Sequence, residues 1–426
     1  MYTLRMPVPV RLLGTLLLCA AAVAAAQEKS SAIPPDQTLR QLIGETLDDN
    51  PSIQAARAAV EAAEARVRGA DRPLYNPELS VDAEQAETRT ATVGLSQAID
   101  WSDKRGARTG VAGAELDRAR AEYADLRQRL AGELLAALGR YHSAADLQSL
   151  AQQRLELMQR FLELAEQRRR AGDVNQVELD LARLAYTQAT LQLSQSVADR
   201  VEAEQALAAV VGESRRNWPV LPQDLPALQD LDTDALLANL PALRVQQTRI
   251  GAARATVTLR MRERRPDPTV EVRAGQERGF RNGSDDAYGA VGLTLSVPLY
   301  VRNSFRAEVD TANAELLQAE REGQDLYRRA RARLLSAADR YRLSRDAWEA
   351  WLRAGQASLS SQVELLDRIW RAGEMSASDY LVQLNQTLDT RANALEVRGR
   401  LWSAWADWLV TGGQIDTWLG GGDTSQ

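Results

Sequence analysis

The chain has 426 residues, a net charge of −6, one histidine and one cysteine, and these features exclude several classes of protein. An acidic balance argues against nucleic acid as a partner. A single histidine and a single cysteine argue against His-based triads, thiol catalysis and disulfide frameworks. We therefore expect neither an enzyme nor a cofactor site.

Residues 1–26 have the layout of a cleaved secretory signal. Arg5 and Arg11 precede an apolar run that ends in three alanines before Gln27. Cleavage would remove Cys19, the only cysteine, together with two positive charges. The mature chain is thus expected to lie outside the cytoplasm. After Ala26 it has no apolar run near the roughly 20 residues of a membrane-spanning helix.

Residues 27–211 are predicted to form a first structural repeat, with helices at 38–49 and 51–69 and a β-hairpin at about 78–97. Along both strands of this hairpin, apolar and polar side chains alternate, which is typical of strands with one apolar and one polar face. The apolar set is Leu79, Val81, Ala83, Ala91, Val93 and Leu95.

The segment 104–211 contains no proline and predicts two long helices folded into a hairpin. In the first arm, every seventh residue from Leu116 to Ala165 is apolar, which indicates a coiled-coil seam. An arm running from Lys104 to Arg170 would be roughly 100 Å long at about 1.5 Å per residue. A helix of this length makes the molecule elongated and does not build a compact globular core.

A Pro-rich connector at 212–234 separates this half from a second repeat, which we place at 235–411. The second half shows the same features in the same order: a β-hairpin at about 269–298, and a proline-free stretch that predicts a long helical hairpin at 303–411. Residues 412–426 are interpreted as a Gly-rich tail.

The two halves match at a nearly constant offset. A shift of 200 pairs Leu95-Ser96 with Leu295-Ser296, and a shift of 201 pairs Arg170 to Asp173 with Arg371 to Glu374. Alanine-rich helices match by chance, but an offset held across strand, helix and turn indicates a duplication.

Four amphipathic strands per chain are too few to close a membrane barrel, since single-chain barrels begin at about eight strands. An open sheet edge is not tolerated in lipid. Either several chains contribute their strands to one barrel in a membrane, or the strands of each chain form a small soluble sheet packed on the helices. The first alternative predicts four lipid-facing residues: Val93, Leu95, Val291 and Leu293.

Over nearly all of its mature length the chain resembles the TolC-like outer-membrane efflux family. The resemblance rests on Leu95-Ser96-Gln97, on Leu295 to Leu299, and on the Arg-Ala-Gly turns at Arg170 and Arg371, in this order. It implies a mainly α fold with a small β part: a trimer whose 12-stranded β-barrel stands on an α-helical tube. It also implies a place in the outer membrane of a Gram-negative bacterium, extending into the periplasm. The implied partners are a periplasmic adaptor and an inner-membrane pump of the resistance-nodulation-division type.

Within the family, residues 99–108 are similar to the Glu-Leu-Gly-Gly-Lys-Arg segment of the cobalt-zinc-cadmium type, although Trp101 to Asp103 depart from it. Heavy-metal cations are therefore one hypothesis for the substrate, and drug efflux or type I secretion are the alternatives. A soluble periplasmic adaptor or scaffold is the alternative from another class. An adaptor would show one hairpin flanked by compact β domains, whereas this chain has two hairpins.

The two helix turns are the main candidate sites. Glycine there can take the left-handed conformation that reverses a helix, and the resemblance implies that these tips form an adaptor-docking mouth. The tip residues are Arg170, Ala171, Gly172, Asp173, Arg371, Ala372, Gly373 and Glu374. Glu178, Asp180 and Asp379 lie just beyond the tips and would form an acidic ring at the entrance of an oligomer, or else a solvated helix face.

A dedicated metal site is not expected. His142 stands alone, and transition-metal sites need several nitrogen, sulfur or carboxylate ligands brought together. Trp402, Trp405 and Trp408 recur at a spacing of three, which favours packing over a ligand cage.

Overall fold

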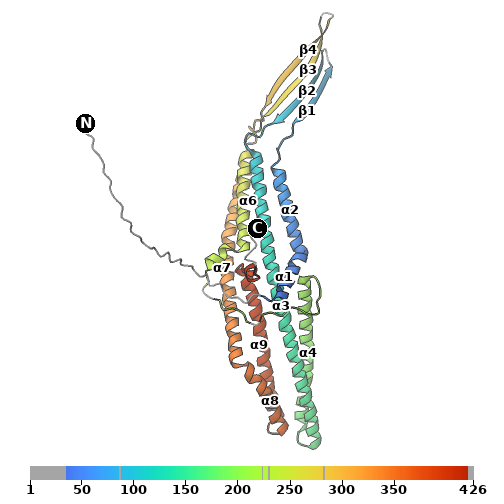
Figure 1. Ribbon diagram of the computed structural model, residues 1–426, viewed down its shortest axis with the longest axis vertical. Helices are drawn as coiled ribbons and strands as arrows, with labels where there is room; N and C mark the ends of the chain where they lie inside the picture. Colours follow the sequence, from blue (N-terminus) through green and yellow to red (C-terminus); the bar gives the residue numbers. More distant parts are fainter. Residues whose placement is uncertain (1–34, 86–87, 223, 229–230, 282–283, 421–426) are drawn as a thin grey trace, which may run out of the picture.

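The computed structural model describes residues 35–85, 88–222, 224–228, 231–281 and 284–420. The predicted signal at 1–26 lies outside these residues. The described chain is a rod: a four-stranded sheet projects from one end, and two helical tips lie at the other (Figure 1). It is mainly helical with a small β part, as predicted.

The elements of the first half are α1 (Gln37–Asp49), α2 (Pro51–Ala70), β1 (Glu78–Gln85), β2 (Thr88–Ala98), α3 (Lys104–Ala171) and α4 (Gln176–Val211). Those of the second half are α5 (Thr233–Ala238), α6 (Pro241–Glu263), β3 (Thr269–Arg281), β4 (Ser284–Ser296), α7 (Arg306–Ala354), α8 (Gln356–Ala372), α9 (Ala377–Thr411) and α10 (Ile415–Trp418). Each half thus runs through helices, a strand hairpin and a long helical hairpin in the same order.

Helix α3 is the centre of the rod. Its 68 residues span roughly 100 Å at about 1.5 Å per residue. The helix contacts α2 and α6 towards the sheet and α4 and α9 towards the tips (Figure 1). Among the described residues, no helix is both long enough and apolar enough to cross a membrane.

The second long hairpin differs from the first at one point. Its first arm is divided at Gly355 into α7 and α8, whereas α3 runs without a break. A Cβ at position 355 would lie 2.4 Å from the Trp351 ring, so the side chain of Trp351 occupies the space that only glycine leaves open.

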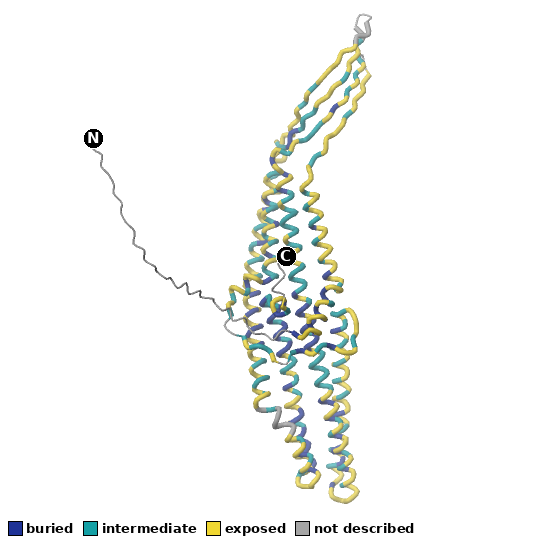
Figure 2. Tube along the Cα trace, in the orientation of Figure 1, coloured by how far each residue is buried: buried dark blue, intermediate teal, exposed yellow. Residues whose placement is uncertain are grey.

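A buried core lies at the middle of the rod (Figure 2). It joins Leu134 and Leu138 of α3 to Tyr341 of α7, and Trp402, Trp405 and Trp408 of α9 are packed into it. The tryptophan series therefore serves packing. A second cluster of buried residues lies near the tips and is centred on Phe161, Trp370 and Tyr380.

The interpretation of 412–426 as a tail is wrong for its first part. Gly413 adopts a φ of 65°, which turns the chain back so that α10 enters the central core. Ile415 and Trp418 of this short helix are both buried there. The last six residues, 421–426, lie outside the described part.

The connector crosses the rod at the level of the central core. Trp218 and Leu221 are buried in that core. The Tyr341 hydroxyl donates to the Pro226 carbonyl at 2.5 Å, and Nε2 of His142 lies 2.8 Å from the Pro219 carbonyl oxygen. The prolines keep this segment out of a helix, and its carbonyls bind side chains of α3 and α7 instead.

The sheet order is β1-β2-β3-β4, with all pairs antiparallel. The central pair, β2 with β3, joins the two halves of the chain and sets Val93 opposite Ala274 and Leu95 opposite Val272. Within the described ranges, strands β1 and β4 are the two edges of the sheet, each paired on one side only.

Candidate functional site

One face of the sheet is a continuous apolar surface. The register places Leu79, Leu95, Val272 and Leu293 in one row across the four strands, and Val81, Val93, Ala274 and Val291 in the next. The sheet extends past the ends of the helices (Figure 1), and these side chains are exposed, with Val291 at 83% and Leu293 at 75%. The alternative of a small sheet packed on the helices is therefore wrong.

The opposite face of the sheet is polar. Its rows contain hydroxyls and carboxylates, such as Ser80 and Asp82 on β1 and Glu271 on β3. The Arg273 guanidinium donates to the Thr294 hydroxyl at 3.1 Å on this face. A sheet with one apolar and one polar face can separate lipid from water.

A buried ion pair fixes the junction between sheet and helices. Lys104 Nζ lies 2.9 Å from Asp267 Oδ2, and their side chains are 8% and 6% exposed. The Tyr75 hydroxyl donates to the same oxygen at 2.6 Å, and this hydrogen bond to the carboxylate raises the pKa of Tyr75 to about 12. The pair connects the start of α3 to the residues just before β3, so it ties the first half to the second.

Sequence reasoning missed this junction. One feature of the sequence could have pointed to Lys104: it is the only lysine after Lys29 in a chain otherwise rich in arginine. Its partner Asp267 lies 163 positions away, and no local pattern connects the two.

Both tips end with the same backbone geometry. Gly172 has a φ of 87° and Gly373 a φ of 77°. The Asp173 amide donates to the Arg168 carbonyl at 2.9 Å, and the Glu374 amide to the Ile369 carbonyl at 3.2 Å. This is the glycine-terminated helix end expected from the sequence.

Alanine at Gly172 or Gly373 is expected to destabilise its tip by about 1–2 kcal/mol, because a Cβ is strained in the left-handed conformation. Gly251 is the matched control. An added Cβ meets nothing within 4 Å at Gly172 or at Gly251, so the two positions differ in φ rather than in space. Since Gly251 lies inside α6, G251A should stabilise by about 0.5–1 kcal/mol. Chemical denaturation of each variant measures the difference, and equal effects would contradict the argument.

The three acidic residues beyond the tips bind groups within their own helix ends. Glu178 accepts from the Asn175 amide at 3.1 Å in a capping box. Asp379 accepts from the Ser376 hydroxyl at 2.7 Å. Asp180 accepts from the Gln176 side chain at 2.9 Å. An entrance ring built from these carboxylates remains a prediction.

Arg168 joins the two tips, a contact that sequence reasoning missed. Its Nη2 donates to the carbonyls of Trp370 at 2.8 Å and Arg371 at 2.9 Å at the end of α8. The Trp370 carbonyl also accepts from the Gly373 amide at 3.0 Å. The guanidinium carbon also lies 4.6 Å from the centre of the Trp370 ring. One side chain therefore links the end of α3 to the end of α8.

Replacing Arg168 by glutamine is expected to loosen the tips by about 1–3 kcal/mol, since two carbonyls lose a charged donor. The matched control is R170Q, because Arg170 is exposed on the same helix end. Hydrogen exchange of the tip amides should accelerate in R168Q and stay unchanged in R170Q. Equal protection in both variants would show that Arg168 does not hold the tips together.

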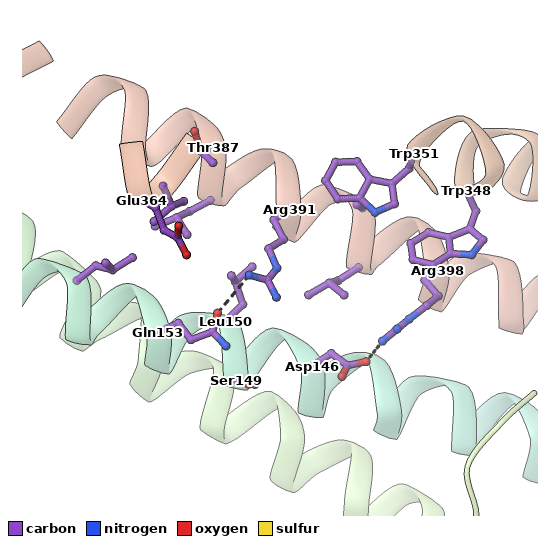
Figure 3. A pocket seen from close by; sticks show the side chains of 15 residues that line it. Asp146, Ser149, Leu150, Gln153, Trp348, Trp351, Glu364, Thr387, Arg391 and Arg398 are labelled. Carbon is purple, nitrogen blue, oxygen red and sulfur yellow. Dashed lines mark hydrogen bonds and ion pairs between the residues drawn. The ribbon is translucent and has the colours of Figure 1, made fainter. Parts of the chain in front are cut away.

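Nearer the central core, the two hairpins border a cleft of about 580 Å³ (Figure 3). Asp146 of α3 forms an ion pair with Arg398 of α9, and Arg391 donates to Gln153 at 3.3 Å. Trp348 of α7 lies beside Arg398, whose guanidinium carbon is 5.7 Å from the ring centre. Burial lowers the pKa of Arg398. These contacts bridge the halves of the chain.

His142 is half-buried and packed against the connector rather than set among other ligands. Desolvation lowers its pKa, which favours the neutral ring. In the part of the chain that the structure describes, no group of three or more His, Cys, Asp or Glu side chains is placed to hold a metal ion.

The same fold occurs in CusC, whose crystal structures are described in terms of transmembrane channel formation. The two superpose with a TM-score of 0.72 over 89% of this chain and 93% of that one, at 16% identity. The rod, the projecting sheet and the paired tips are thus the fold that this chain shares with CusC.

The chain belongs to the outer membrane efflux protein family, whose model matches residues 42–213 and 233–407. It is 25% identical over 272 residues to the cobalt-zinc-cadmium resistance protein CzcC of Cupriavidus metallidurans, covering 62% of this chain and 64% of CzcC. It is 29% identical over 272 residues to the nickel-cobalt-cadmium resistance protein NccC of Alcaligenes xylosoxydans xylosoxydans, covering 59% of this chain and 60% of NccC. The matches thus span less than two thirds of either relative. Family membership places the chain in the outer membrane, extending into the periplasm.

Proposed function

We propose that three copies of this chain form a passive export duct of the outer membrane. An inner-membrane pump of the resistance-nodulation-division type would supply the energy, and a periplasmic adaptor would dock on the helical tips around Gly172 and Gly373. Substrates would leave through a water-filled bore lined by the polar face of the sheet.

The observation that carries this proposal is the sheet. Its apolar face is exposed in the single chain, and among the residues that the structure describes its edge strands β1 and β4 each have a partner on one side only. Unpaired edges are costly in lipid. If β1 of one copy pairs with β4 of the next, three copies form a closed barrel of twelve strands that has no free edge.

A stripe on α4 supports the same arrangement. Val177, Leu184 and Leu191 recur every seven residues and are 76%, 65% and 68% exposed. In a compact monomer such a seam would be buried against another helix. A neighbouring copy in a head-to-tail arrangement would cover this seam, and the same arrangement would pair β1 of one copy with β4 of the next.

Disulfide crosslinking tests the oligomer directly, because the mature chain is expected to contain no cysteine. A cysteine at Ser80 on β1 would be combined with one along β4, at Gly292, Thr294 or Ser296 in turn. Crosslinked trimers are expected for one register and none for either single variant. A protein recovered wholly in the soluble periplasm after fractionation would contradict the duct, and so would the absence of any crosslink.

Heavy-metal cations are the substrate class that we propose, because two relatives are named for resistance to cobalt, cadmium, zinc and nickel. A deletion strain should become sensitive to these metals. Sensitivity to drugs alone, or loss of a secreted protein, would instead favour drug efflux or type I secretion. Unchanged tolerance of all four metals would count against the proposed substrate.

A further inference from the structure

Four linkers connect the sheet to the helices, and they lie where the sheet meets the end of the rod (Figure 1). The linkers are residues 71–77, 99–103, 264–268 and 297–305. The Tyr75 hydroxyl donates to Asp267 at 2.6 Å, which joins the first linker to the third. Arg264 Nε donates to the Ser304 carbonyl at 3.1 Å, which joins the third to the fourth. The linkers therefore form one collar around the junction.

This collar is basic, although the chain as a whole is acidic. Taken with five residues of each adjoining helix, it comprises residues 66–77, 99–108, 259–268 and 297–310. It contains eleven arginines, one lysine and seven acidic residues, which gives a net charge of +5, whereas the whole chain has −6. Within the described ranges, eight of these arginines form no side-chain ion pair or hydrogen bond. Three of the eight lie in separate linkers and are exposed, and we call them the junction arginines: Arg72, Arg265 and Arg302.

The apolar face of the sheet continues into the collar. The alternation of apolar residues along β4 goes on past the end of the strand at Val297, Leu299 and Val301. Leu299 is 76% exposed and Val301 85%, and Trp101 in the linker after β2 is 64% exposed. Tryptophan is enriched at the level where the hydrocarbon of a membrane meets the headgroups. Exposed aliphatic and tryptophan side chains next to a basic cluster are typical of a surface that contacts anionic lipid.

We propose that the junction arginines bind the headgroups of anionic phospholipids in the leaflet of the outer membrane that faces the periplasm. This inference rests on the proposed function, because it requires the apolar face of the sheet to lie in lipid. The helices extend into the periplasm, so the collar lies at the periplasmic boundary of the membrane. Trp101, Leu299 and Val301 then lie in the hydrocarbon beside the headgroups.

The chemistry of the collar favours a lipid over a free anion. A guanidinium group matches phosphate oxygens with two parallel hydrogen bonds, and a free phosphate could accept these as well. The exposed apolar side chains beside the arginines, however, gain contacts only from acyl chains. Each basic residue near an anionic membrane surface strengthens binding about fivefold.

The test measures lipid retained by the trimer of the purified full-length protein in detergent, by native mass spectrometry. The probes are phosphatidylglycerol, phosphatidylcholine and inorganic phosphate. R72Q/R265Q/R302Q should retain phosphatidylglycerol at least about tenfold more weakly than wild type. It should retain phosphatidylcholine as wild type does, because that headgroup has no net charge. If the triple variant does not assemble, R302Q alone should lose about fivefold.

The matched control is R57Q/R244Q/R331Q. These three arginines lie on α2, α6 and α7 outside the collar, and they are also exposed. Their side chains form no ion pair or hydrogen bond in the part of the chain that the structure describes. The control removes the same charge from the chain, so it should retain both lipids as wild type does.

Each outcome decides the question. A loss of phosphatidylglycerol confined to the junction variants supports the inference. Unchanged retention in those variants, equal loss in the control or equal loss of phosphatidylcholine would overturn it. Displacement of phosphatidylglycerol by an equal concentration of inorganic phosphate would also overturn it, since the site would then be one for free anions. If wild type still forms the crosslinked trimer in those cases, the proposed duct stands and only the lipid site fails.

Discussion

Arginine at Leu293 is expected to impair membrane assembly by about 2–4 kcal/mol per chain, the cost of placing this side chain near the middle of the bilayer. Leu293 is 75% exposed on the apolar face and shares a row with Leu79, Leu95 and Val272. Because a trimer would contain the substitution three times, the yield of assembled protein in the outer-membrane fraction should fall steeply. The yield of trimer that resists detergent measures this effect.

The control is arginine at Ser296, three residues along the same strand and on the polar face. Water in the bore would solvate that guanidinium, so S296R should assemble nearly as well as wild type. V93R should behave as L293R does, because Val93 lies on the apolar face in the next row. If both faces tolerate arginine alike, the assignment of Val93, Leu95, Val291 and Leu293 to lipid is wrong.

Alanine at Asp267 is expected to destabilise the chain by about 3–5 kcal/mol, since it leaves Lys104 as an uncompensated buried charge. The effect should appear as a lower midpoint in chemical denaturation followed by circular dichroism. Tyr75 would also lose its acceptor at 2.6 Å. The sheet is joined to the helices at this point, so trimer yield should fall as well.

A double replacement, K104M/D267L, distinguishes the cost of an unpaired buried charge from the cost of losing the ion pair. With both charges gone, no ion remains to be desolvated, and most of the stability should return. Y75F should cost only about 1 kcal/mol, since it removes one hydrogen bond. A double variant as unstable as D267A would show that the geometry of the pair, and not the stranded lysine, determines stability here.

Much of the architecture follows from local pattern. The seven-residue repeat from Leu116 and the absence of proline determine α3, and alternation determines the four strands, because helix and strand periods depend on neighbours a few residues away. Glycine at 172 and 373 determines the helix ends for the same reason. The matched offsets between the halves then predict which elements recur.

Only the tertiary structure decided which distant residues meet. Arg168 and Trp370 lie 202 positions apart, as Lys104 and Asp267 lie 163 apart; each contact exists because the two halves are aligned along one rod. The break at Gly355 and the docking of α10 in the core depend on the space that neighbouring side chains leave. The register decided which side chains share a row of the sheet, since a shift of one residue would move every side chain to the other face.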